Sequence, residues 1–253
     1  MKPELLYGQR PAADFRYAGA PLDTSLVNDI ALENVQIHYA LFEVPMDTAL
    51  ACLPVSLHPA IPAHPGITFW RCEDGPLGAF ECAWVGLACR TGIKPRHLVQ
   101  AAFASNAGVA AWLQQRYGFD CQVAEVRYRE TYDRLSGRIV IDGTTVLETM
   151  STRMQPVVGA GASVKFSPAL NAARIDDLPL MVQMEAAYAF KRVIRGTPQI
   201  LAWDAAALGA PQLQPKFPMS GAHALVDLTL HPPRFTADFA LPAEQGGARK
   251  IAR

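Results

Sequence analysis

The chain has 253 residues, of which half are apolar and 18% are charged, and this balance excludes an intrinsically disordered protein. Basic and acidic residues number 23 each, so the formal net charge is zero. A dedicated nucleic-acid-binding protein carries a basic excess or stripe, so we predict no nucleic-acid partner. The absence of net charge also permits copies of the chain to associate, and the length predicts one or two domains.

The sequence shows no segment typical of a membrane or secreted protein. No apolar run approaches the roughly 18 residues needed to span a bilayer. The first ten residues, MKPELLYGQR, carry charges and a proline where a signal peptide is apolar. The five cysteines are widely spaced with no CxxC pair, which favours reduced thiols over a disulfide scaffold. We therefore expect a cytoplasmic protein with no membrane partner.

The sequence of residues 1–66 predicts an extended arm followed by short elements. Residues 1–30 are rich in Pro, Gly, Ala and Asp, which predicts an extended arm with short turns. Mixed β-branched and aromatic residues predict a strand over 35–44. Helical spacing predicts a helix over 46–53 that ends at Pro54. Three prolines in eleven residues predict a loop or edge segment over 56–66.

The rest of the chain predicts a mostly antiparallel sheet with one long helix. An Ala-, Gln- and Leu-rich stretch predicts this helix over 96–118, with a break near Ser105 and Asn106. The segment 180–196 fits a strand or a helix, and the end of the chain, 240–253, predicts a flexible tail. Alternating patterns separated by turn signals predict further strands; these are 67–73, 78–90, 121–133, 137–143, 144–154 and 222–230. No repeat or linker divides the chain, so we predict a single α+β domain over 1–253.

Motifs for common cofactors are missing from the sequence. It contains no Walker loop, no HExxH and no G-x-S-x-G, and Gly159-Ala160-Gly161 lacks the third glycine of a dinucleotide fingerprint. His58, His64 and Cys72 are candidate metal ligands, but prolines between the histidines prevent a shared helix face. We therefore predict no cofactor and no metal site.

Two side chains are candidates for acid–base or nucleophilic chemistry. Glu81 lies in a predicted strand among the uncharged residues Phe80, Cys82 and Trp84. A carboxyl group desolvated there has a raised pKa, which suits general acid–base catalysis, whereas an outward-facing Glu81 is simply solvated. Cys121 is a candidate nucleophile if a cation or a histidine lies nearby, and otherwise a packed thiol.

The order of these segments resembles the acetoacetate decarboxylase superfamily. The segment GPLGAFECAWVGLACR resembles a strand pair of that family, with Gly78, Phe80, Ala83, Cys89 and Arg90 in register. SNAGVAAWLQQRYGFDCQVAEV resembles its helix-to-turn signature, and LSGRIVIDGTTVLETMSTRM resembles the hairpin that follows. GTPQILAWDAAALG and GAHALVDLTL resemble its closing pattern.

This resemblance covers about residues 35–232 and implies a β-rich cone or barrel with flanking helices. It also implies a buried apolar pocket and a homo-oligomer. In the family, the first lysine of a G-F-P-K-K run forms a Schiff base with a β-keto acid. The second lysine lowers the pKa of the first by like-charge repulsion.

The chain departs from the family at these lysines. Gly118 and Phe119 match the run, but the proline position holds Asp120, and the two lysine positions hold Cys121 and Gln122. A thiol or an amide cannot form an iminium, so the usual Schiff-base decarboxylation is not available at this position.

The position of the family's active-site glutamate is also changed. This glutamate aligns with Cys82, and Glu81 is one residue away, which places it on the other face of a regular strand. Another lysine is a candidate to take over the Schiff-base role; the internal choices are Lys94, Lys165 and Lys191.

We therefore expect a small-molecule enzyme of lyase, hydratase or isomerase type that acts on an oxo acid, enol or lactone without a lysine. The expected site residues fall into two sets. Those for catalysis are Glu81, Cys82, Asp120, Cys121 and Gln122. Those for substrate binding are Phe80, Trp84, Arg90, Trp112 and Phe119, with Arg16 as a second candidate for binding a carboxylate.

Two alternatives remain open at the level of the sequence. One is a binding protein that keeps the apolar pocket without catalysis, and the other is a true decarboxylase with a relocated lysine. Convergence of Cys121, Cys82 and Glu81 on one cavity would favour an enzyme, whereas their dispersal would favour a binding protein.

Overall fold

A computed structural model describes residues 6–15, 17, 21–91, 94–159, 163–175, 178–233, 235–239, 241 and 249–250. Within these ranges the chain forms the following elements: the 3-10 helix η1 (Ala12–Asp14), β1 (Ile30–Glu43), α1 (Met46–Cys52), β2 (His58–Pro59), β3 (Pro65–Cys72), β4 (Phe80–Thr91), β5 (Lys94–Ala104), α2 (Ala107–Tyr117), β6 (Cys121–Val123), β7 (Glu125–Glu130), β8 (Leu135–Ile141), β9 (Thr144–Pro156), β10 (Ala169–Ile175), β11 (Leu178–Met184), β12 (Ala186–Trp203), β13 (Phe217–Leu230), β14 (Phe235–Asp238) and β15 (Arg249–Lys250).

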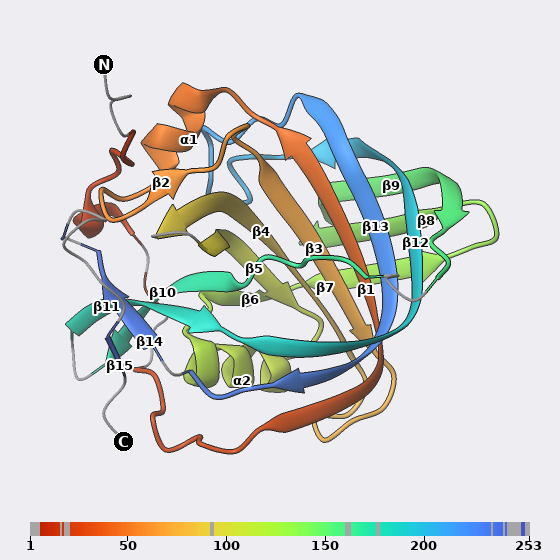
Figure 1. Cartoon of the computed structure of the whole chain (residues 1–253), viewed down its shortest axis with the longest axis horizontal. Coiled ribbons are helices and arrows are strands. Elements are labelled where there is room, and N and C mark those ends of the chain that lie inside the picture. The colour runs from red at the N-terminus through yellow and green to blue at the C-terminus, as the bar shows by residue number, and fades with distance from the viewer. Residues whose placement is uncertain are drawn as a thin grey trace.

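All of these strands belong to one large, strongly curved sheet (Figure 1). Its order is β15-β14-β11-β10-β5-β4-β3-β1-β13-β12-β9-β8-β7, with β2 added to β4 and β6 added to β5. The pairings of β5 with β10 and with β6 are parallel, and the other pairings are antiparallel. The predicted α+β class with a mostly antiparallel sheet is confirmed.

The sheet is open, so the predicted cone or barrel is not established. β15 and β7 end the order, and no strand pairing joins them among the described residues. The free edge of β7 instead approaches β4 through a side chain. The Tyr128 backbone N–H donates to a carboxylate oxygen of Glu81 at 2.9 Å.

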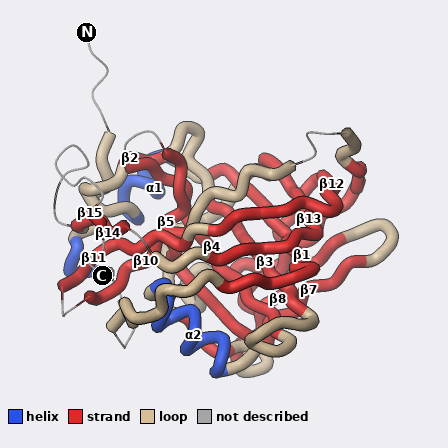
Figure 2. The backbone as a smooth tube through the Cα atoms, turned by 60° about the horizontal axis from the view of Figure 1, so that its bottom comes forward, coloured by secondary structure: helices blue, strands red, loops and turns tan. Residues whose placement is uncertain are grey.

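Both faces of the central strands are buried, and each face belongs to a separate core. In β4, Phe80, Cys82 and Trp84 pack into one core, whereas Ala83 and Val85 pack into the other. A strand buried on both sides has a nearly continuous apolar sequence, as this segment does. α2 covers the first of these two faces (Figure 2).

The predicted helix over 96–118 is wrong in its first half. Residues up to Ala104 form β5, and only Ala107–Tyr117 is helical. The expected break is confirmed, because the Asn106 side chain accepts a hydrogen bond from Val109 N at 2.9 Å and caps α2. Alanine-rich sequence favours a helix locally, but partners on both edges of β5 override that propensity.

The other predicted elements are placed as follows. α1, β8 and β9 lie where the sequence predicts them. The single strand predicted over 121–133 is divided, because 121–123 form β6 against β5 and 125–130 form β7 against β8. The ambiguous segment 180–196 forms most of β11 and the first part of β12. In the predicted tail, Arg249–Lys250 pair with β14, and Leu241 is the other described residue. No helix within the described ranges is both long and apolar enough to cross a membrane.

Candidate active site

The most distinctive local feature of the sheet is a gap along one edge of β5. β10 pairs with β5 at His97 and Leu98, and β6 pairs with it from Ala102 to Ala104. No strand pairs with this edge at the residues between them, 99–101, among the described parts of the chain. The backbone groups of 99–101 on this edge therefore take no part in a strand pairing.

A β-bulge lies at the same position on β5. Ala101 pairs with Val85 and Val99 pairs with Gly86, so Gln100 is an extra residue opposite β4. A bulge redirects side chains and occurs often beside active sites. The Gln100 amide nitrogen donates to the Leu98 carbonyl at 3.2 Å, and its oxygen accepts a hydrogen bond from Arg10 Nη1 at 3.4 Å.

The end of α2 brings β6 to one side of the gap. Gly118 has φ +71° and its N–H bonds to carbonyls of the last helical turn, which ends the helix. A Cβ at Gly118 would lie 2.3 Å from the Cβ of Ala173, so glycine also allows close approach to β10. Asp120 and Gln122 follow directly and border the gap.

The N-terminal arm supplies the cation of this site. The N–H of Gly8 bonds to the carbonyl of Leu57, and the N–H of Arg10 bonds to that of Leu53, so the arm is fixed to the segment around α1. The Arg10 guanidinium lies over the Phe15 ring at 4.1 Å and donates to the Asp14 carbonyl at 2.7 Å. A guanidinium held in this way is oriented before a ligand arrives.

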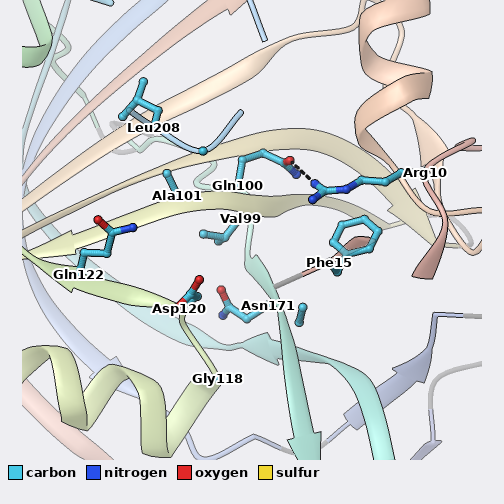
Figure 3. Close-up of a pocket in the computed structure, with 12 residues that line it drawn as sticks. Arg10, Phe15, Val99, Gln100, Ala101, Gly118, Asp120, Gln122, Asn171 and Leu208 are labelled. Atoms are coloured by element: carbon cyan, nitrogen blue, oxygen red, sulfur yellow. Dashed lines mark hydrogen bonds between the residues drawn. The ribbon is translucent and has the colours of Figure 1, made fainter. Parts of the chain in front are cut away.

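Together these elements border a small cavity with a volume of about 60 Å³. Figure 3 shows the side chains that line it. The lining residues are Arg10, Phe15, Val99, Gln100, Ala101, Gly118, Asp120, Gln122, Asn171, Ala172, Leu208 and Gly209. The cavity thus combines one guanidinium, one carboxylate and three amides with an apolar remainder. Such a set can bind a small anionic molecule and move a proton on it.

Of the five residues predicted for catalysis, Asp120 and Gln122 share this cavity. Asp120 directly precedes β6 and Gln122 lies within it, and their side chains border the same space (Figure 3). Cys121 lies between them and packs instead against the core beneath α2. The alternation of side chains at the start of a strand is sufficient to produce this division.

Cys82 and Cys121 belong to this apolar core. Cys82 is 1% exposed, and burial raises the pKa of its thiol well above the ordinary value. Burial, with a smaller effect of Asp120, raises the pKa of Cys121 to about 12. A thiol with a raised pKa stays protonated at neutral pH, so neither residue has the thiolate that a nucleophile needs.

Glu81 lies in a second cavity at the end of β3 and the start of β4, lined also by Arg71, Arg127 and Tyr128. Its carboxylate is occupied by the Tyr128 N–H, and its own N–H donates to Ser105 Oγ at 3.0 Å. Glu81, Cys82 and Cys121 therefore do not share one cavity.

The aromatic residues predicted for substrate binding pack together in the core beneath α2. Trp84 contacts Phe119 with ring centroids 5.7 Å apart, and Trp112 contacts Tyr117 at 5.9 Å. Phe80 belongs to the same core. None of the four predicted aromatics lines the cavity at the β5 gap.

The remaining candidates lie away from this cavity. Arg90 is exposed at the end of β4. Lys165 is exposed, and Lys191 forms an ion pair with Asp227 at 2.6 Å. Arg16 and the side chain of Lys94 are outside the described residues.

Sequence reasoning missed Arg10, Gln100 and Asn171. Arg10 and Asn171 are far from the matched motifs, and no local pattern marks them. Gln100 carries a weak signal, since it is the single polar residue in the apolar run 98–104, and such a residue is typical of a bulge or a site. Among the described residues, no three His, Cys, Asp or Glu side chains lie close enough together to hold a metal ion.

Comparison with solved structures identifies the fold. Acetoacetate decarboxylase from Legionella pneumophila superposes with a TM-score of 0.71 at 18% identity, over 86% of this chain and 87% of that one. The enduracididine biosynthesis enzyme MppR, solved with pyruvate, gives 0.68 at 18% identity, over 85% and 98%. An acetoacetate decarboxylase-like enzyme from Sphingomonas wittichii gives 0.66 at 11% identity, over 85% and 98%.

The chain therefore has the acetoacetate decarboxylase-like fold, and the resemblance inferred from the sequence is confirmed at this level. No protein-family model matches the sequence, and no curated protein matches it. At these identities the comparison establishes the fold, and the chemistry has to be argued from the site itself.

Proposed function

We propose that the chain is a small-molecule enzyme that moves a proton at the carbon next to the carbonyl group of an oxo acid, without forming a Schiff base. The observation that carries this proposal is the composition of the cavity at the β5 gap. It holds the carboxylate of Asp120 and the guanidinium of Arg10, and its lining among the described residues contains no lysine.

Each polar group has a defined part in this reaction. Arg10 binds the substrate carboxylate, because a guanidinium presents parallel donors that match its two oxygens. Asp120 accepts a proton from the neighbouring carbon, and the electron pair of the broken C–H bond moves onto the carbonyl oxygen. The resulting enolate is stabilised by the amide N–H of Gln122, which lies two residues beyond Asp120 and borders the same cavity. Return of the proton to another atom completes an isomerisation.

The solved structures support the substrate class. MppR, which has the same fold, was solved with pyruvate bound, and pyruvate is an oxo acid. An oxo acid carries both the carboxylate that Arg10 would bind and the carbonyl group that an enolate requires. Loss of water would pass through the same enolate, and cleavage of a carbon–carbon bond next to the carbonyl would generate it.

Ligand binding without catalysis is the second candidate function. The dispersal of Glu81, Cys82 and Cys121 favours it, because these three groups do not meet in one cavity where they could act on a substrate together. Asp120 and Arg10 do line one cavity, and this different pair of residues supports a catalytic function. Proton exchange distinguishes these two functions.

The test is NMR detection of deuterium incorporation next to the carbonyl of a panel of oxo acids in D₂O. We expect exchange with wild-type protein, and a loss of about 10² to 10⁴-fold in Asp120→Asn, because a positioned general base contributes that much. Asp47→Asn, an exposed carboxylate on α1, is the matched control and should keep the wild-type rate. Binding without exchange would establish the second candidate.

A parallel experiment addresses the Schiff base. Intact-mass spectrometry after incubation with each oxo acid and sodium borohydride should show no reduced adduct. An adduct on any lysine would overturn the lysine-independent mechanism and point to a relocated lysine.

A further inference from the structure

Asn171 is a buried amide whose hydrogen-bonding capacity is not used by the protein. Its side chain is 2% exposed, and neither its amide nitrogen nor its amide oxygen has a hydrogen-bond partner among the described residues. A buried donor or acceptor left unsatisfied costs about 1 to 3 kcal/mol. Native proteins keep few such groups, and those they keep often serve a site.

The position of Asn171 in the sheet indicates that a ligand would supply the missing hydrogen bonds of its amide. β10 pairs with β5 through Leu170, and Asn171 is the next residue, where the ladder has opened into the gap. Its side chain lines the cavity beside Asp120 (Figure 3). Both polar atoms are buried in the cavity without a ligand, so a ligand has to reach into the gap beside Asp120 to pair with this donor and this acceptor.

We infer that Asn171 is a substrate-specificity residue that recognises a carbonyl group together with a hydroxyl group on the adjacent carbon. The amide N–H donates to the carbonyl oxygen, and the amide oxygen accepts from the hydroxyl. This inference rests on the proposed function and narrows its substrate class to hydroxy-oxo acids. A carboxylate would not satisfy Asn171, because it offers no donor to the amide oxygen.

Isothermal titration calorimetry with pyruvate and hydroxypyruvate tests the assignment. These two oxo acids differ by one hydroxyl group next to the carbonyl. We expect wild-type protein to bind hydroxypyruvate about tenfold or more tightly, since one buried hydrogen bond to a preformed site is worth about that factor. Asn171→Leu, of similar shape and without polar atoms, should reduce this preference to about onefold.

A stability measurement separates recognition from a structural role. Asn171→Leu removes the unsatisfied amide, so its melting temperature without ligand should rise by about 2 to 4 °C. Asn171→Asp keeps acceptors and loses the donor, so it should bind both oxo acids more weakly and retain the hydroxyl preference. Gln155→Leu changes an exposed amide on β9 and should leave the preference unchanged.

Three results would overturn the assignment: equal affinity for the two acids in wild-type protein, an unchanged preference in Asn171→Leu, or a lower melting temperature in that variant. Failure of the proposed function is recognised separately. Deuterium exchange without a hydroxyl preference would leave the proposed function standing and remove the role of Asn171. A hydroxyl preference without deuterium exchange would remove the proposed proton transfer and leave Asn171 as a ligand-recognition residue.

Discussion

At the scale of single residues, Glu81 illustrates how a plausible catalytic group is used for structure. Its carboxylate accepts the Tyr128 N–H on the free edge of β7, where no strand supplies a carbonyl among the described residues. This contact bridges two strands that are distant in the order of the sheet, so we expect its main contribution to be to stability.

Substitution of Glu81 distinguishes stability from catalysis. Glu81→Gln keeps an acceptor oxygen and should leave the free energy of unfolding nearly unchanged, whereas Glu81→Ala should lower it by about 1 to 3 kcal/mol. Urea denaturation measures both. Deuterium exchange should persist in Glu81→Gln, and its loss there would return Glu81 to the list of catalytic residues.

Gly118 is the residue on which the position of Asp120 depends. Gly118→Ala should lower the free energy of unfolding by more than the roughly 1 to 3 kcal/mol of left-handed backbone strain, because its Cβ would collide with Ala173. Gly143→Ala is the matched control, since Gly143 also has a positive φ of 77° but open space around its Cβ position. Equal losses in the two variants, measured by urea denaturation, would show that the contact with β10 is unimportant.

At the scale of elements, α2 positions one side of the cavity, and Asn106 fixes where that helix starts. Asn106→Ala removes the cap on Val109 N and should cost about 1 kcal/mol, whereas Asn106→Asp should retain most of the stability. Thermal unfolding followed by circular dichroism provides the measurement. A loss as large in Asn106→Asp as in Asn106→Ala would contradict a capping role.

At the scale of the whole molecule, three buried histidines make the fold sensitive to acid. Burial, with His223 nearby, lowers the pKa of His38 to about 4, and burial with His64 nearby lowers that of His97 to about 3. Burial also lowers the pKa of His223 to about 4, although Glu130 opposes the shift. A histidine in the unfolded chain has a pKa of about 6.5.

The sign of the effect follows from these pKa values. Below about pH 6.5 the unfolded chain binds protons that the folded chain excludes, so stability decreases as the pH falls towards 4. We expect a loss of about 1 kcal/mol or more for each histidine by pH 5. Urea midpoints between pH 7.5 and pH 4.5 provide the measurement, and His38→Leu should make the slope shallower. A flat profile would contradict the three lowered pKa values.

The amino-acid sequence by itself determined the class of the fold, because alternating apolar residues and turn signals report on local structure and on burial. It also determined that the lysine pair of the resembling family is absent, since Cys121 and Gln122 replace it whatever the fold does. The same segment contains Asp120 and Gln122, and both border the cavity at the β5 gap.

Only the tertiary structure decided which side chains meet. β5 contradicted the helical propensity of its own sequence, because pairing on both edges outweighs a local preference. The cavity brings together Arg10 from the N-terminal arm, Gln100 from the bulge of β5 and Asn171 from β10. Backbone pairing between segments far apart in the sequence places them there. No local sequence pattern specifies which distant residues meet, whereas the tendency of a segment to form a strand depends on its own residues.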